Sequence, residues 1–204
     1  MPTMLASLLE ASIPDMQVKA DVLAFGGASL AAHWNRGEVQ KRLAAQKWNA
    51  VVLQDQSTRP LRALKSMQEH VRRFVDEIQI SGAKPYLYMT WARKNDPASQ
   101  ANIVTAFQGL AKVTGARVIP VGLAWDQFRS LRPEIDLYEP DGSHPSVIGS
   151  YLVACTHVFS FADIEAVSDR LAEKTLSTID LNLLHEVCRT TARSDRTFRT
   201  FRSS

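Results

Sequence analysis

Short apolar runs of strand length alternate with amphipathic stretches of helix length along most of the chain, and this pattern limits the folds it can adopt. Apolar runs that fit strands lie at residues 17–25, 49–54, 84–90 and 117–121. Apolar residues recur at helical spacing in residues 3–12, 37–46, 61–80, 98–113 and 147–160. Strands separated by helices in this way are typical of a parallel sheet with helices on both faces. The sequence therefore predicts a three-layer α/β/α fold.

Composition and charge exclude several classes of protein. The 204 residues are 45% hydrophobic and 22% charged, which is enough apolar material for a full core. No run of 18 apolar residues is present, so we expect no membrane-spanning helix. The formal net charge is +3, but the last sixteen residues hold five arginines and one aspartate, and the rest of the chain carries −1. The folded part is therefore not expected to bind nucleic acid.

The two cysteines, Cys155 and Cys188, are too few for a disulfide framework or a four-cysteine metal site. Neither has a spacing from a histidine that is specific enough to indicate metal binding, and we expect no metal site. Cys155 lies in an apolar stretch and is expected to be buried. The first ten residues lack the basic segment of a signal peptide, so the chain as written is expected in the cytoplasm. A secreted or periplasmic location would follow if a targeting segment preceded Met1.

The chain is expected to form one main domain followed by a short C-terminal region. Residues 1–160 contain the alternating pattern and form the predicted domain. Residues 161–188 are predicted as a helical extension, because Ile164, Val167 and Leu171 have helical spacing. Residues 189–204 are predicted as a basic, disordered tail.

Functional groups in open α/β sheets gather at the carboxyl ends of the strands, and this chain has glycine or polar residues at those positions. Gly27 follows the first predicted strand within Gly-Gly-Ala-Ser, and its backbone N–H can point at a ligand or simply form a turn. Gln54 ends the second strand, where its amide can donate to an oxyanion or remain solvated. Trp91 and Arg93 follow the third strand and can line a substrate pocket, although lid or core packing of Trp91 and a solvated charge at Arg93 are the more common explanations.

The pair that points most clearly to a catalytic site is Asp141 and His144, in the sequence Asp-Gly-Ser-His-Pro within a Pro- and Asp-rich loop. A hydrolase that uses a serine needs an imidazole to take its proton and a carboxylate to orient the imidazole. Three residues apart on a turn, both side chains can face one site. The same pattern also fits a turn in which Asp141 is a capping residue and His144 is an ordinary surface residue.

Taken together and in order, these motifs resemble the SGNH (GDSL-like) hydrolases over about residues 1–158, with a bacterial branch as the nearest likeness. The resemblance implies a flavodoxin-like parallel sheet and no cofactor. It implies that His144 is the catalytic base and that Asp141 orients it. It also implies that the Gly27 N–H and the Gln54 side chain form the oxyanion hole.

One motif of that family is absent from the chain. The nucleophilic serine of the family lies in a Gly-x-Ser motif at the end of the first strand, and the chain begins with a predicted helix instead. The first strand and its serine are therefore expected upstream of Met1. Three serines lie beside the predicted site, but each occurs in a motif with another role, and none is expected to replace the nucleophile: Ser29, Ser57 and Ser143.

The expected activity is hydrolysis of a small-molecule or carbohydrate ester, by an esterase or a carbohydrate-ester deacetylase. The alternative is a catalytically inactive, truncated protein of hydrolase fold that binds an acylated small molecule or sugar around Trp91 and Arg93. A third possibility is that the arginine-rich tail binds an acidic partner. The identity of the acyl group and of the alcohol does not follow from the sequence.

Overall fold

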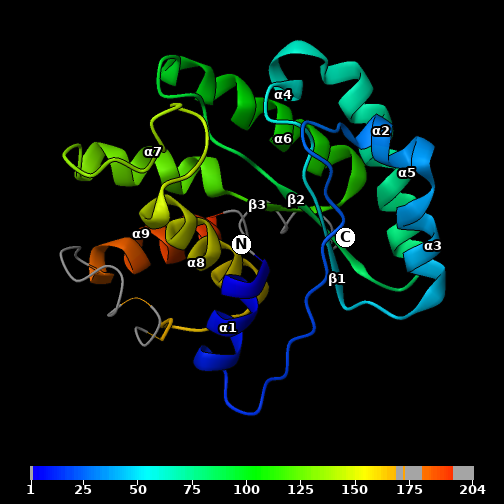
Figure 1. The fold of residues 1–204 in the computed structure, drawn as a ribbon, viewed down its shortest axis with the longest axis horizontal. Helices are drawn as coiled ribbons and strands as arrows, with labels where there is room; N and C mark the ends of the chain where they lie inside the picture. Colours follow the sequence, from blue (N-terminus) through cyan, green and yellow to red (C-terminus); the bar gives the residue numbers. More distant parts are fainter. Residues whose placement is uncertain (1, 169–171, 173–180, 195–204) are drawn as a thin grey trace, which may run out of the picture. The chain divides into compact units, whose positions relative to one another are not determined.

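A computed structural model describes residues 2–168, 172 and 181–194, in which helices and strands alternate through the middle of the chain (Figure 1). The strands are β1 (Ala50–Leu53), β2 (Lys84–Tyr88) and β3 (Arg117–Ile119). The helices are α1 (Pro2–Ser12), α2 (Leu30–Arg36), α3 (Glu38–Ala45), α4 (Arg59–Arg62), α5 (Leu64–Ile80), α6 (Gln100–Thr114), α7 (Val121–Leu131), α8 (Val147–Phe161) and α9 (Leu181–Ser194), with a 3₁₀ turn, η1 (Pro97–Ser99). The predicted α/β fold is confirmed.

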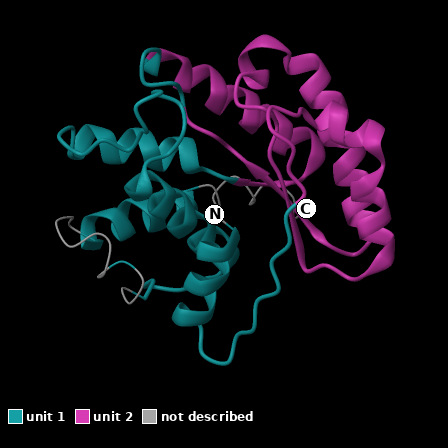
Figure 2. Ribbon diagram, in the orientation of Figure 1, with its two compact units in different colours: residues 1–22, 92–97, 119–204 teal, residues 23–91, 98–118 magenta. Residues whose placement is uncertain are grey.

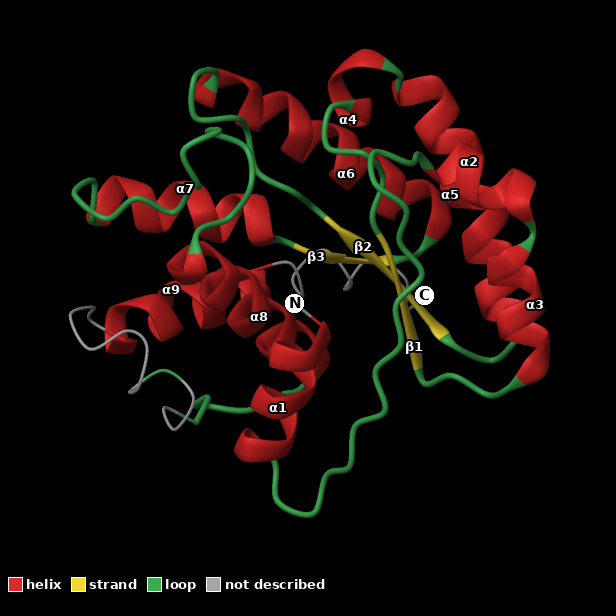
Figure 3. Cartoon of the chain, in the orientation of Figure 1, coloured by secondary structure: helices red, strands yellow, loops and turns green. Residues whose placement is uncertain are grey.

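The strands form a small sheet in the order β1-β2-β3 (Figure 3). β1 and β2 are parallel, with Val52 opposite Tyr86 and Leu53 opposite Leu87. In β2 every residue after Lys84 is buried, as expected for a parallel strand covered on both faces. Three of the four residues of β1 are only half-buried, although its sequence is fully apolar.

The chain divides into two compact units, each built from separate stretches of sequence (Figure 2). Unit 1 comprises residues 1–22, 92–97 and 119–204, and unit 2 comprises residues 23–91 and 98–118. Unit 2 contains β1, β2 and helices α2 to α6, whereas unit 1 contains α1, α7, α8 and α9. The predicted boundaries at residues 160 and 188 follow the order of the sequence and do not describe this division.

Helix α5 supplies much of the core of unit 2. Its buried residues recur at helical spacing and form one face: Met67, Val71, Phe74, Val75 and Ile78. The ring of Phe74 meets that of Trp34 on α2 edge-to-face, with centroids 5.0 Å apart. The predicted helix over 61–80 is divided at Ala63, whose φ of −150° and ψ of 44° separate α4 from α5.

The predicted strand over residues 17–25 is wrong. The segment belongs to no strand among the described residues, and Val22 is 57% exposed. Alternating apolar residues are compatible with a strand, but a strand forms only where a neighbouring strand takes up its backbone hydrogen bonds. At the end of the segment, Phe25 packs instead on α2, where the guanidinium carbon of Arg36 lies 4.0 Å from its ring centre.

Helix α8 is the centre of unit 1, and residues 151–160 are all buried. Helix α9 packs on α8 through its own buried face, which includes Leu184, Val187 and Cys188. Cys155 is buried as predicted, and burial raises the pKa of the Cys188 thiol to about 12. Both thiols are therefore part of the core.

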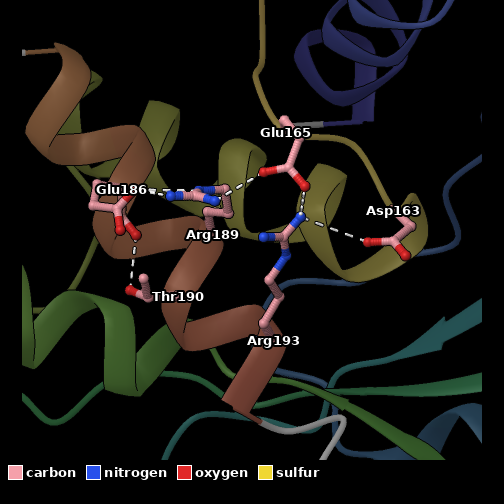
Figure 4. Close-up of polar contacts among 6 residues, drawn as sticks. All are labelled: Asp163, Glu165, Glu186, Arg189, Thr190 and Arg193. Carbon is pink, nitrogen blue, oxygen red and sulfur yellow. Dashed lines mark hydrogen bonds and ion pairs between the residues drawn. The ribbon is translucent and has the colours of Figure 1, made fainter.

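The C-terminal region differs from its prediction. Residues 162–168 form no helix, and α9 continues to Ser194, six residues into the predicted tail. The buried face of α9 extends to Ala192. Figure 4 shows that Arg189 and Arg193 of α9 are paired with acidic residues. Arg189 bonds to Glu165 at 2.9 Å and also to Glu186, and Arg193 bonds to Glu165 at 2.5 Å. Leu171, the remaining arginines of the predicted tail and residues 195–204 as a whole lie outside the described residues.

Within residues 2–168, 172 and 181–194, none of the helices combines the length and the hydropathy that a membrane crossing requires. The same residues contain no group of three or more histidine, cysteine, aspartate or glutamate side chains placed to hold a metal ion.

Candidate functional site

The loop between α7 and α8 brings Asp141 and His144 into direct contact. Oδ1 of Asp141 accepts hydrogen bonds from the backbone N–H groups of Ser143 and His144, at 2.8 and 2.9 Å. Gly142, at the centre of this turn, has a φ of +65°, which favours glycine. The other carboxylate oxygen, Oδ2, is hydrogen-bonded to Nδ1 of His144. The turn therefore presents a preformed carboxylate–imidazole pair.

The hydrogen bonds around Asp141 favour its ionised form. They lower the pKa of its carboxyl group to about 2, mainly through the His144 side chain and then through the backbone N–H groups of His144 and Ser143. Asp141 is thus ionised at neutral pH. A carboxylate only accepts hydrogen bonds, so Nδ1 of His144 carries the proton in this pair, and Nε2 of the neutral ring is the basic nitrogen. The His144 side chain is 78% exposed, so Nε2 is accessible.

Contacts on both sides hold this loop in place. The Tyr138 hydroxyl donates to the backbone oxygen of Ala92 at 2.7 Å, and the backbone N–H of Lys94 donates to the oxygen of Gly142 at 2.9 Å. Within the loop, Tyr138 and Pro145 form an antiparallel bridge. The segment 92–97 and the Asp141 turn are therefore joined directly by the hydrogen bond between Lys94 N and Gly142 O.

The start of α8 fixes the other end of the loop. Ser146 is the N-cap residue of α8, and its Oγ accepts from Gly149 N at 3.2 Å and donates to Asp136 O at 3.0 Å. A Cβ atom on Gly149 would lie 2.3 Å from the oxygen of Leu137 and 2.6 Å from the ring of Trp125. Sequence reasoning missed both residues, although a serine before an apolar helix is a recognised N-cap signal.

The two predicted oxyanion residues lie in unit 2. Gly27 is exposed with a φ of +70°, in a turn where Ala28 N donates to Phe25 O at 3.0 Å. Its N–H has no hydrogen-bond acceptor in the described part of the chain. Gln54 is exposed directly after β1. Each group is therefore available to an incoming ligand.

Asp55 connects the loops that carry these two residues. It is 6% exposed, and its Oδ1 accepts from Leu30 N at 3.0 Å and from Gln56 N at 2.8 Å. The residues after β1 are thus tied to the first turn of α2, which directly follows the turn of Gly27. Sequence reasoning assigned Asp55 no role, because the pairing spans 25 residues and leaves no local pattern. Ser29, in the same region, is the N-cap residue of α2.

The predicted site residues are thus divided between the units. Asp141, His144 and Arg93 belong to unit 1, and Gly27, Gln54 and Trp91 belong to unit 2. Within unit 1, a hollow of about 260 Å³ adjoins the Asp141 turn, and it is lined by Arg93, Lys94, Asn95, Pro140, Asp141 and Gly142. Trp91 is half-buried and does not line this hollow.

Fold and site define an α/β protein with a preformed aspartate–histidine pair in the loop before a buried helix. No protein-family model and no curated protein matches the sequence. Among solved structures, a candidate SGNH hydrolase from Slackia heliotrinireducens has a TM-score of 0.66 and 29% identity, over 79% of this chain and 90% of that one. A Bacillus subtilis protein, YxiM, has a TM-score of 0.58 and 17% identity, over 74% of this chain and 47% of that one. The chain has the fold of SGNH, or GDSL-like, hydrolases, as its motifs predicted.

Proposed function

We propose that this chain supplies the base and the oxyanion hole of a serine ester hydrolase, an esterase or a carbohydrate-ester deacetylase acting on a small-molecule or carbohydrate ester. The observation that carries the proposal is the hydrogen bond from His144 Nδ1 to an Asp141 carboxylate that two backbone N–H groups already hold. An imidazole held in this way has one defined tautomer and a free Nε2, which is what a general base requires.

In the proposed reaction, Nε2 of His144 removes the proton from a serine hydroxyl as its oxygen attacks the acyl carbonyl carbon. The tetrahedral intermediate then collapses, and His144 returns the proton to the leaving alcohol. Water repeats the two steps on the acyl-enzyme and releases the acid. Asp141 remains ionised throughout and stabilises the imidazolium that forms after each proton transfer.

The Gly27 N–H and the Gln54 side-chain amide are proposed to stabilise the oxyanion of the intermediate. Each donor of this kind is worth a factor of about 10²–10³ in rate. The positive φ of Gly27 and the Asp55 hydrogen bonds that connect the two loops support this assignment, because preorganised donors are more effective than mobile ones.

The nucleophile is proposed to be a serine in a Gly-x-Ser motif on a strand upstream of Met1. Strand β1 supports this proposal, because it pairs with β2 along one edge and no hydrogen bond between described residues occupies its other edge. Val51 and Val52 are only half-buried, whereas parallel strands of α/β proteins are normally covered on both faces. A further strand along β1 would pair with its backbone groups and cover part of both side chains.

The test is hydrolysis of p-nitrophenyl acetate by the protein purified from its native source and by the same protein with His144→Ala. We expect the substitution to lower kcat by a factor on the order of 10⁴–10⁶. His70→Ala is the matched control, because the Nδ1 of His70 bonds only within α5, to Ser66 O at 2.8 Å. An unchanged rate after His144→Ala would show that His144 is not the base.

The alternative function is ligand binding without turnover. One observation favours it: in the described part of the chain no hydroxyl group is hydrogen-bonded to Nε2 of His144. The intact mass of the native protein separates the two functions. A mass above the 22.7 kDa of this sequence, from an N-terminal extension containing Gly-x-Ser, supports the hydrolase. A mass of 22.7 kDa with calorimetric binding of an acylated sugar supports the binding protein.

A further inference from the structure

We propose that the hollow beside Asp141 binds a carboxylate through Arg93, so that the ester taken by this protein carries one negative charge. The inference rests on the proposed function only in identifying the ligand as a substrate, since the binding itself needs no turnover. The hollow belongs entirely to unit 1 and shares Asp141 with the candidate catalytic pair.

The walls of the hollow are held together by main-chain atoms. One wall is the segment from Arg93 to Asn95, and the other is the turn from Pro140 to Gly142. The hydrogen bond from Lys94 N to Gly142 O joins them at 2.9 Å. A Cβ on Gly142 would lie 3.3 Å from the Cβ of Lys94, which shows how closely the walls approach. The backbone around the hollow is therefore preformed, and the ordering cost of binding falls mainly on the Arg93 side chain.

The charges around the hollow leave Arg93 uncompensated. Nζ of Lys94 is paired with Asp136 at 2.5 Å, and Asp141 is engaged by His144 and by backbone N–H groups. The guanidinium of exposed Arg93 has no hydrogen bond and no ion pair among the described residues. The exposed amide of Asn95, beside it, is likewise available. One cation and one neutral amide are thus presented to a ligand.

This combination selects a carboxylate among the common anions. The planar guanidinium matches the two oxygens of a carboxylate and binds them through a pair of parallel hydrogen bonds. A phosphate monoester carries nearly two negative charges, and its stronger repulsion by the ionised Asp141 in the same hollow offsets its stronger attraction to Arg93. A neutral ligand would form no ion pair with the guanidinium.

The experiment compares two esters of equal size that differ only in charge, monoethyl succinate and ethyl succinamate. Binding to the full chain is followed through the backbone amide resonances of Lys94 and Gly142 at near-neutral pH. We expect the carboxylate to bind about fivefold more tightly than the amide, which is the upper end for a solvent-exposed ion pair. The preference should decrease at high ionic strength, since salt screens exposed charges.

Substitutions connect the preference to one side chain. Arg93→Ala should abolish the fivefold preference, and Arg93→Lys should retain part of it, because lysine keeps the charge and loses the paired hydrogen bonds. Arg72→Ala is the matched control, an exposed arginine on α5 of unit 2 that does not line the hollow, and it should leave the preference unchanged.

Equal binding of the two esters, binding of neither, or a preference that survives Arg93→Ala would each overturn the proposal. Its failure is distinguishable from failure of the proposed function, because uncharged p-nitrophenyl acetate does not need Arg93. A charge preference together with a rate that does not depend on His144 would retain the carboxylate site and reject the hydrolase mechanism.

Discussion

Nδ1 of His144 is hydrogen-bonded to Oδ2 of Asp141, and Oδ1 of the same carboxylate accepts the backbone N–H of His144 itself at 2.9 Å. The two residues are therefore linked through both side chain and main chain. This double link holds the carboxylate at one position relative to the ring. It also makes the geometry of the pair dependent on the charge of Asp141.

The ordered Asp141 turn is expected to be lost in acid. The folded-state pKa of Asp141 is lowered from 3.8 to about 2, so its hydrogen bonds stabilise the turn fully above pH 3.8 and are lost as the pH falls through about 2. A pH titration of the Ser143 and His144 amide resonances measures this. In Asp141→Asn the transition should be absent, and the same midpoint in that variant would show that another group causes it.

Gly27→Ala is expected to lower the hydrolytic rate of the full native protein, whereas Gly26→Ala should change it little. The reason is the φ of +70° at Gly27, which costs an alanine roughly 1–2 kcal/mol and displaces the N–H that is proposed to bind the oxyanion. Gly26 is also exposed, and its φ is not positive. Steady-state kinetics with p-nitrophenyl acetate compares the two, and equal losses would remove the special role of Gly27.

Gly149→Ala is expected to destabilise the chain by about 1–3 kcal/mol, as overpacking of a core does. Its Cβ would lie 2.3 Å from the main-chain oxygen of Leu137, which cannot move without distorting the loop that carries Asp141 and His144. The matched control is Gly109→Ala on exposed α6 surface, where a Cβ meets nothing within 4 Å. That substitution should stabilise the helix by about 0.5–1 kcal/mol. Urea denaturation measures both, and a stable Gly149→Ala variant would contradict the close packing.

Removal of α9 is expected to destabilise unit 1. Truncation after residue 180 exposes the surface of α8 that Leu184, Val187 and Cys188 cover, and each buried apolar side chain of this size contributes roughly 1.5–3 kcal/mol. Truncation after Ser194 keeps α9 and is the matched control, because it removes only the residues that follow the helix. Thermal denaturation of the two proteins is the measurement, and equal melting temperatures would mean that α9 contributes little to the stability of unit 1.

The sequence predicted what depends on near neighbours. Helices α5 and α8 follow from apolar residues at helical spacing, and β2 follows from an apolar run ended by turn residues. The contact between Asp141 and His144 also belongs here, because three residues on a glycine-containing turn suffice to bring the two side chains together. Their catalytic role stays a prediction.

Only the tertiary structure decided what depends on distant partners. Residues 17–25 have the pattern of a strand and form none among the described residues, because a strand requires a neighbour. Asp55 is hydrogen-bonded to the first turn of α2, 25 residues away in the sequence. Position 149 requires glycine because the carbonyl oxygen of Leu137 leaves no room for a Cβ atom. The sequence predicts a tail at Arg189 and Arg193, whereas the structure pairs both side chains with Glu165. Local periodicity determines which helices and strands can form. Which of them do form depends on burial and on hydrogen-bond partners that are distant in the sequence.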